Sequence, residues 1–388
     1  MLEERVGDEP FEAFRDTVRR FVRERLVPAE AQAIQQNWVP EAILAEMRDL
    51  GLFGLTVPAE YGGSGLQIDQ YLEIIQQLAW AAPAFRSAIA INTGILSTAL
   101  RNDATEAQRA EYFPKIVAGQ IGSFALTEPD SGSDSAAMKT RAERDGDSYV
   151  INGSKRYITN GPKADFLLVM ARTSRENLPS NAHVSGFLVP ADTPGVARGK
   201  PDKKMGQQGA LTSDLYFEDV RVPASSLLGG VEGIGFKTAM KALDGGRLSV
   251  AAASIGYGRR ILETAMRYAT ERKAFNEPIA NFQLIQAMLA DSEIELYAAE
   301  CMMRDAARKA ARGERILKEG AATKVFASEA VGRIADRCVQ IYGGSGYMAE
   351  YEAERFYRDA RVYRIYEGTT QILQLVIARA MLKEFAAA

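Results

Sequence analysis

The feature that most constrains the fold is a block of short strand-like segments, residues 123–230, that separates two long helical regions. Within the block, Asp145-Gly146 and Asn152-Gly153 each stand between strand-like runs, and Asp-Gly and Asn-Gly are the strongest short-range signals of a β-hairpin. The pattern predicts a compact antiparallel β domain with strands near 138–143, 148–151, 155–159, 166–171, 184–189 and 214–222.

The regions on either side of this block have helical patterns. Phe11, Phe14, Val18 and Phe21 recur at helical spacing, and further helices are expected at 68–80 and 86–101. Long helices are expected at 235–272, 281–312 and 317–342, and shorter ones at 351–359 and 369–384. The sequence therefore predicts an α+β, mainly α protein with an N-terminal all-α domain (1–122), a middle antiparallel β domain (123–230) and a C-terminal four-helix bundle (231–388).

Charge and residue usage exclude several classes of protein. The net charge of -3 argues against a nucleic-acid-binding protein, which usually has a basic stripe. His183 is the only histidine, so neither a His-activated nucleophile nor a metal site is expected. Cys301 and Cys338 are the only cysteines, and we expect reduced core thiols. Without a signal peptide or a long apolar run, we expect a cytoplasmic protein with no stable membrane insertion.

Three segments are rich in small, hydrogen-bonding residues: 125–134, 157–161 and 340–347. Each alone is typical of an ordinary loop. Together they indicate a site for a large polar heterocycle with a phosphate arm, because hydroxyls can bind the ring edge and glycines let the backbone approach a pyrophosphate. Gly343, Gly344 and Gly346 follow a predicted helix rather than a strand, so they do not form a dinucleotide-fold fingerprint.

Three charged residues stand at unusual positions. Glu367 lies between an aromatic ring and a glycine and could be a base in a water-poor pocket; the alternative is a solvated carboxylate near the start of the last helix. Arg247 lies in an otherwise apolar helix and needs an acidic partner, for which Glu367 is one candidate. Arg272 ends a helix, where it either complements the helix dipole or binds a phosphate.

With these residues in place, the chain resembles the acyl-CoA dehydrogenase family over nearly its whole length and in the order of its helical and β segments. The segment 125–134 resembles the first family signature, and Gln340, Gly343, Gly344, Gly346, Tyr347 and Glu350, continuing to Arg355 and Asp359, resemble the second. The resemblance implies a non-covalent FAD, an acyl-CoA substrate, a homotetramer and an electron-transfer flavoprotein as the electron acceptor.

The resemblance also assigns site residues. Contacts to the flavin ring would come from Phe124, Leu126, Thr127, Gly132, Ser133, Tyr157, Ile158, Thr159, Thr369 and Gln371, with Tyr157 where tryptophan is frequent in the family. The adenosine diphosphate part, often of a neighbouring subunit's FAD, would contact Arg272, Phe275, Phe282, Gln283, Gln340, Ile341, Gly343 and Gly344. The acyl-CoA would lie near Ser133, Asp244, Arg247, Tyr366, Gly368 and Arg379.

The reaction that the resemblance implies is the α,β-dehydrogenation of a saturated acyl-CoA to the trans-2-enoyl-CoA. Glu367 matches the base that removes the α-proton, and the β-hydrogen would leave as a hydride to the flavin. Some family members carry the base at the position of Gly246, which has no side chain here, so Glu367 remains as the candidate. Alternatives are an acyl-CoA oxidase, another flavin oxidase or monooxygenase on this fold, or a non-catalytic flavoprotein. The acyl chain length stays open.

Overall fold

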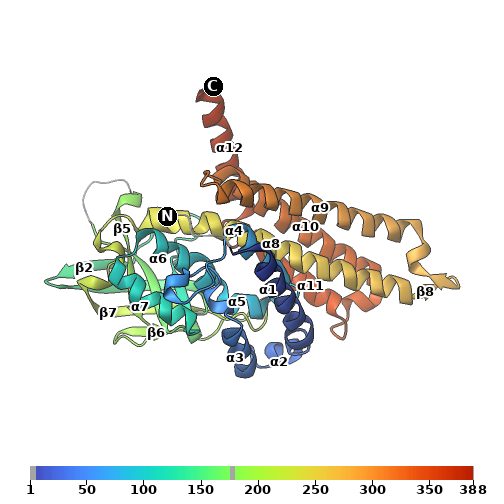
Figure 1. The fold of residues 1–388 in the computed structure, drawn as a ribbon, viewed down its shortest axis with the longest axis horizontal. Coiled ribbons are helices and arrows are strands. Elements are labelled where there is room, and N and C mark those ends of the chain that lie inside the picture. Colours follow the sequence, from blue (N-terminus) through green and yellow to red (C-terminus); the bar gives the residue numbers. More distant parts are fainter. Residues whose placement is uncertain (1–5, 175–179, 388) are drawn as a thin grey trace.

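The computed structural model describes residues 6–174 and 180–387, and its elements follow the order helices, sheet, helices (Figure 1). The N-terminal helices are α1 (Asp8–Phe21), α2 (Glu30–Gln35), α3 (Glu41–Asp49), α4 (Ile68–Leu78), α5 (Pro83–Ile91), α6 (Ser97–Asp103) and α7 (Glu106–Val117). A π-helical segment, Asn92–Leu96, joins α5 to α6, so the helix expected at 86–101 is one long interrupted helix. Phe11, Val18 and Phe21 are buried, as their helical spacing predicts.

The middle of the chain forms a seven-stranded sheet. Its strands are β1 (Gly122–Ala125), β2 (Arg141–Asp145), β3 (Ser148–Thr159), β4 (Phe166–Arg172), β5 (Val184–Pro190), β6 (Val196–Arg198) and β7 (Thr212–Pro223). The order is β1-β4-β2-β3-β7-β6, with β5 also paired to β4. Most strand pairs are antiparallel, as predicted, but β1 pairs in parallel with β4. Sequence alone does not indicate this pairing, because about forty residues separate the two strands.

The prediction of a hairpin turn is wrong at one of its two positions. Asp145 pairs with Ser148 across Gly146, as expected. At Asn152-Gly153, however, β3 continues without a turn, and only its register against β7 shifts there. The reason is close approach: Gly153 has φ 150°, and a Cβ there would lie 2.5 Å from Thr140 Oγ1. The glycine therefore relieves crowding within a strand instead of making a turn.

The C-terminal helices lie close to their predicted positions. They are α8 (Gly235–Glu271), α9 (Gln283–Ala311), α10 (Leu317–Tyr342), α11 (Glu352–Ala360) and α12 (Thr370–Ala387), and a short hairpin of β8 (Lys273–Ala274) and β9 (Glu277–Pro278) separates α8 from α9. In Figure 1, α8, α9 and α10 run side by side, and the last part of α12 projects away from them. The hairpin lies at the end of these helices opposite to the sheet.

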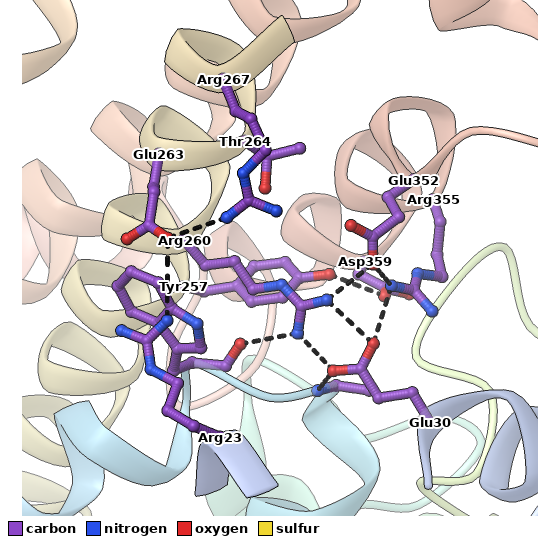
Figure 2. A network of polar contacts seen from close by, with 12 residues as sticks. Arg23, Glu30, Tyr257, Arg260, Glu263, Thr264, Arg267, Glu352, Arg355 and Asp359 are labelled. Carbon is purple, nitrogen blue, oxygen red and sulfur yellow. Dashed lines mark hydrogen bonds and ion pairs between the residues drawn. The ribbon is translucent and has the colours of Figure 1, made fainter. Parts of the chain in front are cut away.

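The N-terminal helices and the C-terminal bundle share one hydrophobic core. Side chains such as Phe53 and Phe85 pack in the same cluster as Ile255 on α8 and Phe356 on α11. A buried polar network adds to this contact: Glu30 on α2 accepts hydrogen bonds from Arg260 on α8 and Arg355 on α11, at 3.1 and 3.0 Å (Figure 2). The orientation of the N-terminal helices relative to α8 is therefore fixed by both apolar and charged contacts.

The two cysteines differ from expectation in one respect. Cys338 is buried on α10, and burial raises the pKa of its thiol to about 12. Cys301 is exposed on α9, so the expectation of a core thiol is wrong for this residue. Among the described helices, none is both long and apolar enough to cross a bilayer.

Candidate active site

Glu367 lies in a tight turn that joins a 3-10 segment, Arg361–Arg364, to α12. Its φ of 56° is in the left-handed region, where residues other than glycine are strained, and Gly368 follows with φ 93°. Such backbone strain persists only when surrounding contacts hold it, and it often marks functional sites. Here Lys324 on α10 donates a 2.8 Å hydrogen bond to the carbonyl of Gly368, and the Thr369 hydroxyl accepts one from the N–H of Ile372.

One oxygen of the Glu367 carboxylate is buried. Its Oε2 atom is buried and has no hydrogen-bond partner among the described residues, although the rest of the side chain borders open cavities. Burial raises the pKa of Glu367 to about 7, against the opposing effect of Arg86, Arg247 and Lys324. This environment differs from that of a solvated carboxylate at a helix start.

Gly246 on α8 makes room for this carboxylate. A Cβ at position 246 would lie 2.7 Å from Glu367 Oε2, closer than real Cβ contacts allow. At Gly245, by contrast, a Cβ would meet nothing within 4 Å. The absence of a side chain at Gly246 therefore lets the Glu367 carboxylate lie against α8.

The cations around Glu367 are not all the expected ones. The acidic partner of Arg247 is Asp244, at 2.5 Å, and the candidate Glu367 forms no ion pair with it. Burial lowers the pKa of Lys324 to about 8, with Glu367 opposing that effect. Sequence reasoning missed Lys324 and Arg86. One signal could have revealed Lys324: it is a lysine among the residues that form the buried, mainly apolar face of α10.

Two cavities meet at Glu367. The first, of about 250 Å³, brings together the tip of β1, the loop after it, the bulged part of β3 and the N-terminal half of α8. Eight of the ten residues expected to contact a flavin ring line it: Phe124, Leu126, Thr127, Gly132, Ser133, Tyr157, Ile158 and Thr159. Arg247, Tyr366 and Gly368, all expected near the acyl-CoA, line it as well.

The loop between β1 and β2 is held in place by a buried ion pair. Glu128 Oε1 accepts hydrogen bonds from Lys155 Nζ at 2.8 Å and from the N–H of Thr140 at 3.0 Å. Burial lowers the pKa of Lys155 to about 8, against the attraction of Glu128. The next residues of β3 continue the link, because the N–H of Arg156 donates to the carbonyl of Thr127 at 2.8 Å. This arrangement fixes Thr127 beside the first cavity.

The second cavity, of about 340 Å³, lies between α5, α8, the loop 204–210 and the segment before Glu367. It shares Ile91, Ile95, Thr159, Tyr366 and Glu367 with the first cavity. Ser87, Ala90, Ile91 and Gly94 line it, so the segment 87–94 forms one of its walls. Glu367 therefore faces both the cavity that could bind a ring and a second, mainly apolar cavity.

Other predicted site residues lie elsewhere. Those expected to hold adenosine diphosphate gather at the far end of the bundle, near the β8–β9 hairpin (Figure 1). Phe275, in the hairpin, is 90% exposed. Tyr342 stacks on Tyr268 with ring centroids 3.8 Å apart, and this contact brings the end of α10 beside the end of α8. None of this group lines either cavity. Arg379 is exposed on α12 and also lines neither cavity, so the structure does not place it near Glu367.

The first cavity suits the ring part of FAD. Thr127, Ser133 and Thr159 offer hydroxyls, Leu126 and Ile158 offer apolar surface, and the buried, unpaired Oε2 of Glu367 lies at the border. The adenosine part does not have its expected partners in the same cavity of this chain. The predicted contacts to the adenosine part therefore lie in another part of the chain than the predicted contacts to the ring.

Comparison with known proteins agrees with this geometry. Family models for the N-terminal, middle and C-terminal domains of acyl-CoA dehydrogenases match residues 8–120, 123–220 and 233–382. A probable acyl-CoA dehydrogenase of Bacillus subtilis (strain 168) is 40% identical, over 95% of this chain and 97% of its own.

Two solved structures are also similar. Butyryl-CoA dehydrogenase from Megasphaera elsdenii has a TM-score of 0.92 and 33% identity, covering 98% of this chain and 100% of its own. A chain in a structure described as the electron transferring flavoprotein of Acidaminococcus fermentans has a TM-score of 0.93 and 35% identity, covering 98% and 99%. The protein therefore belongs to the acyl-CoA dehydrogenase family of FAD-dependent oxidoreductases.

Proposed function

We propose that the protein removes two hydrogens from Cα and Cβ of a saturated acyl-CoA and forms the trans-2-enoyl-CoA, with Glu367 as the base for the α-proton. One observation carries this proposal: the Glu367 carboxylate, with a buried, unpaired Oε2 and a pKa of about 7, borders both the first and the second cavity. A base with such a pKa is half ionised near neutral pH and is well matched to proton abstraction.

The residues around Glu367 support this role in two ways. The strained turn and Gly246 hold the carboxylate at the junction of the cavities, so that little reorganisation is needed at the moment of proton transfer. The backbone N–H of Glu367 has no acceptor among the described residues and can donate to a thioester carbonyl, which stabilises the negative charge that develops there. When FAD is bound, it supplies the hydride acceptor.

We also propose the assembly and the electron acceptor that the family resemblance implies. A homotetramer would cover the exposed Phe275 and Leu284, which are 90% and 81% exposed, and would bring the adenosine-binding candidates of one copy to the ring-binding cavity of another. An electron-transfer flavoprotein is the proposed acceptor, supported by the similar chain in the Acidaminococcus fermentans structure. The cytoplasmic location stays a prediction from the sequence.

The test is the Glu367→Gln variant of the FAD-loaded protein, mixed anaerobically with saturated acyl-CoAs of varied length while flavin bleaching is followed. We expect the bleaching rate to fall by about 10²–10⁴-fold, the usual contribution of a positioned base. Glu271→Gln, which changes an exposed carboxylate at the end of α8, is the matched control and should bleach at the wild-type rate.

If Glu367→Gln bleached as fast as the wild type, another group would be the base. Rapid peroxide formation by the reduced wild-type protein would instead indicate an oxidase. A protein that binds FAD but is bleached by no acyl-CoA would indicate a non-catalytic flavoprotein.

A further inference from the structure

Helix α10 carries a buried lysine directly behind the turn that contains Glu367. Lys324 is fully buried, and its ammonium donates a 2.8 Å hydrogen bond to the carbonyl of Gly368, the residue after Glu367. Lys324 lines neither cavity, whereas Glu367 and Gly368 both border the first one. Lys324 therefore contacts the turn from the protein interior and is not placed to touch a ligand in either cavity.

A second residue of α10 holds the chain on both sides of Glu367. Glu329 Oε1 accepts a 2.9 Å hydrogen bond from the hydroxyl of Thr370, and Glu329 Oε2 lies 3.2 Å from Nε of Arg364 in an ion pair. Thr370 follows Glu367 by three positions, and Arg364 precedes it by three. A Cβ at Gly332 would lie 2.0 Å from Nη2 of Arg364, so this glycine leaves room for the guanidinium against α10.

The turn needs such contacts because its backbone is strained. Glu367 and Gly368 have φ of 56° and 93°, and a residue other than glycine keeps a positive φ only when its surroundings hold it. The peptide unit is planar, so the hydrogen bond from Lys324 to the Gly368 carbonyl fixes the orientation of the whole peptide between Gly368 and Thr369. Since α10 packs against both α8 and α9, the turn is held by an element that is itself anchored in the bundle.

Lys324 also acts on Glu367 through its charge. Glu367 is faced by Arg86 from α5, by Arg247 from α8 and by Lys324 from α10, and all three oppose the rise of its pKa. Lys324 in turn is faced by Glu367, by Arg247 and by Glu329 on its own helix, and burial lowers its pKa to about 8. Among the described residues Lys324 forms no direct ion pair, so its attraction for Glu367 acts over a longer distance than a salt bridge.

We propose that Lys324 is a positioning residue for the base: its hydrogen bond to the Gly368 carbonyl holds the strained turn, its charge favours the ionised form of Glu367, and Glu329 fixes both ends of the turn to the same helix. The proposal rests on the dehydrogenase function above and adds residues that act through the base without touching the substrate.

The hydrogen bond and the charge of Lys324 can be separated by substitution. Lys324→Gln keeps an N–H donor and removes the charge, whereas Lys324→Met removes both with an unbranched side chain. Loss of the donor should displace the Glu367 carboxylate and slow proton abstraction. Loss of the charge should raise the pKa of Glu367, because an opposite charge nearby favours the ionised form. A lysine that served only the stability of the fold would change neither.

The experiment uses the FAD-loaded full-length protein, mixed anaerobically with butyryl-CoA, hexanoyl-CoA or octanoyl-CoA between pH 5.5 and 9. Stopped-flow bleaching gives the limiting rate constant of flavin reduction and the apparent Kd of each thioester. Lys324→Met should lower the rate constant by about 10²-fold, the cost of a misplacement near 1 Å. The apparent Kd should change little, because Lys324 lines neither cavity.

Lys324→Gln should recover most of the rate at high pH, but in both variants the inflection of the pH profile should move upward by about 1 pH unit. Glu329→Leu, which releases Arg364 and Thr370, should also lower the rate constant, by about 10-fold. Lys318→Met is the matched control, the same substitution on the same helix. Lys318 pairs with Glu384 on α12, and its loss should change neither the rate constant nor the inflection.

FAD content per chain and the thermal midpoint of each variant show whether it is folded. The proposal is overturned if Lys324→Met and Lys324→Gln keep the wild-type rate constant and inflection, or if their rates fall only in proportion to lost FAD. If none of the thioesters bleached the wild-type flavin, the dehydrogenase function would fail instead. Infrared difference spectra against Glu367→Gln titrate this carboxyl group without turnover, so an unchanged pKa of Glu367 in Lys324→Gln would still overturn the role of Lys324.

Discussion

Single residues at the site adopt backbone conformations that side chains usually avoid. Glu367 and Tyr157 both have positive φ, at 56° and 57°, and both border the first cavity. Tyr157 lies where the pairing of β3 with β7 is irregular, and it is 60% exposed. Sequence patterns gave no sign of this strain, since tyrosine and glutamate are ordinary residues in a strand and near a helix start. Strain of this kind comes from the packing around the residue.

The pH dependence of the proposed reaction follows from the pKa of Glu367. Because burial raises that pKa from 4.5 to about 7, the free protein should gain activity as the pH rises through about 7 and the carboxylate ionises. A profile of kcat/KM between pH 5 and 9 checks this expectation. An inflection near the ordinary glutamate value, or none, would contradict it.

The same shift predicts an effect on stability. A folded pKa above the unfolded value means that the protonated form is favoured by folding; this contribution is complete below about pH 4.5 and is lost as the pH rises through about 7. Above pH 7 the ionised Glu367 should therefore destabilise the protein by roughly 3 kcal/mol. Glu367→Gln should then raise the thermal midpoint at pH 8.5 and have little effect at pH 4.5. Equal effects at both pH values would show that the shift is absent.

The two adjacent glycines of α8 offer a matched pair of substitutions. Gly246→Ala should displace the Glu367 carboxylate and lower kcat/KM by about 10²-fold, the cost of a misplacement near 1 Å. Gly245→Ala meets no neighbour, should leave kcat/KM unchanged and should stabilise the helix by about 1 kcal/mol. If both variants had the same activity, Gly246 would not be making room for the base.

At the scale of elements, periodicity and turn signals predicted where most helices and strands begin and end. The helices expected at 235–272, 281–312 and 317–342 are α8, α9 and α10, within a few residues. Pairing between elements was not predictable in the same way. The parallel contact of β1 with β4 and the continuous β3 depend on distant residues such as Thr140 beside Gly153, which local patterns do not contain.

A network of ion pairs centred on Glu30 joins α2, α8 and α11 (Figure 2). Glu30→Gln removes a buried charge and leaves Arg260 and Arg355 without it, which should destabilise the protein by about 3–5 kcal/mol. Chemical denaturation measures this change. The control is Glu263→Gln, whose pair with Arg267 has side chains 43% and 64% exposed and should matter by less than about 1 kcal/mol. Similar losses in both variants would contradict the network's importance.

At the scale of the whole molecule, the predicted FAD contacts form two separated groups. One group lines the cavity beside Glu367, and the other lies in and after the β8–β9 hairpin and at the end of α10. A single copy of the chain does not bring them together. Together with the exposed Phe275 and Leu284, this separation is why we expect cofactor binding and assembly to depend on each other.

The variant Arg272→Ala tests that dependence. Loss of a guanidinium bound to a phosphate should weaken FAD binding by about 10–100-fold, although the substitution lies far from the ring-binding cavity. The bound FAD per chain after gel filtration, followed with light scattering, measures both cofactor content and assembly. Tyr216→Ala, which removes an exposed aromatic side chain on β7, is the control and should keep full FAD content. Full FAD content in Arg272→Ala would contradict the shared site.

The sequence alone determined the order of helical and β segments, the FAD-binding signatures and Glu367 as the candidate base, because periodicity, turn residues and short motifs are local properties. Only the tertiary structure decided that two cavities meet at this carboxylate and that Arg86 and Lys204 line one of them. Arg86 bonds to Ser249, which is 163 positions away, and Lys324 bonds to Gly368 across 44 positions. Contacts over such separations are set by how helices pack, and no local pattern in the chain specifies them.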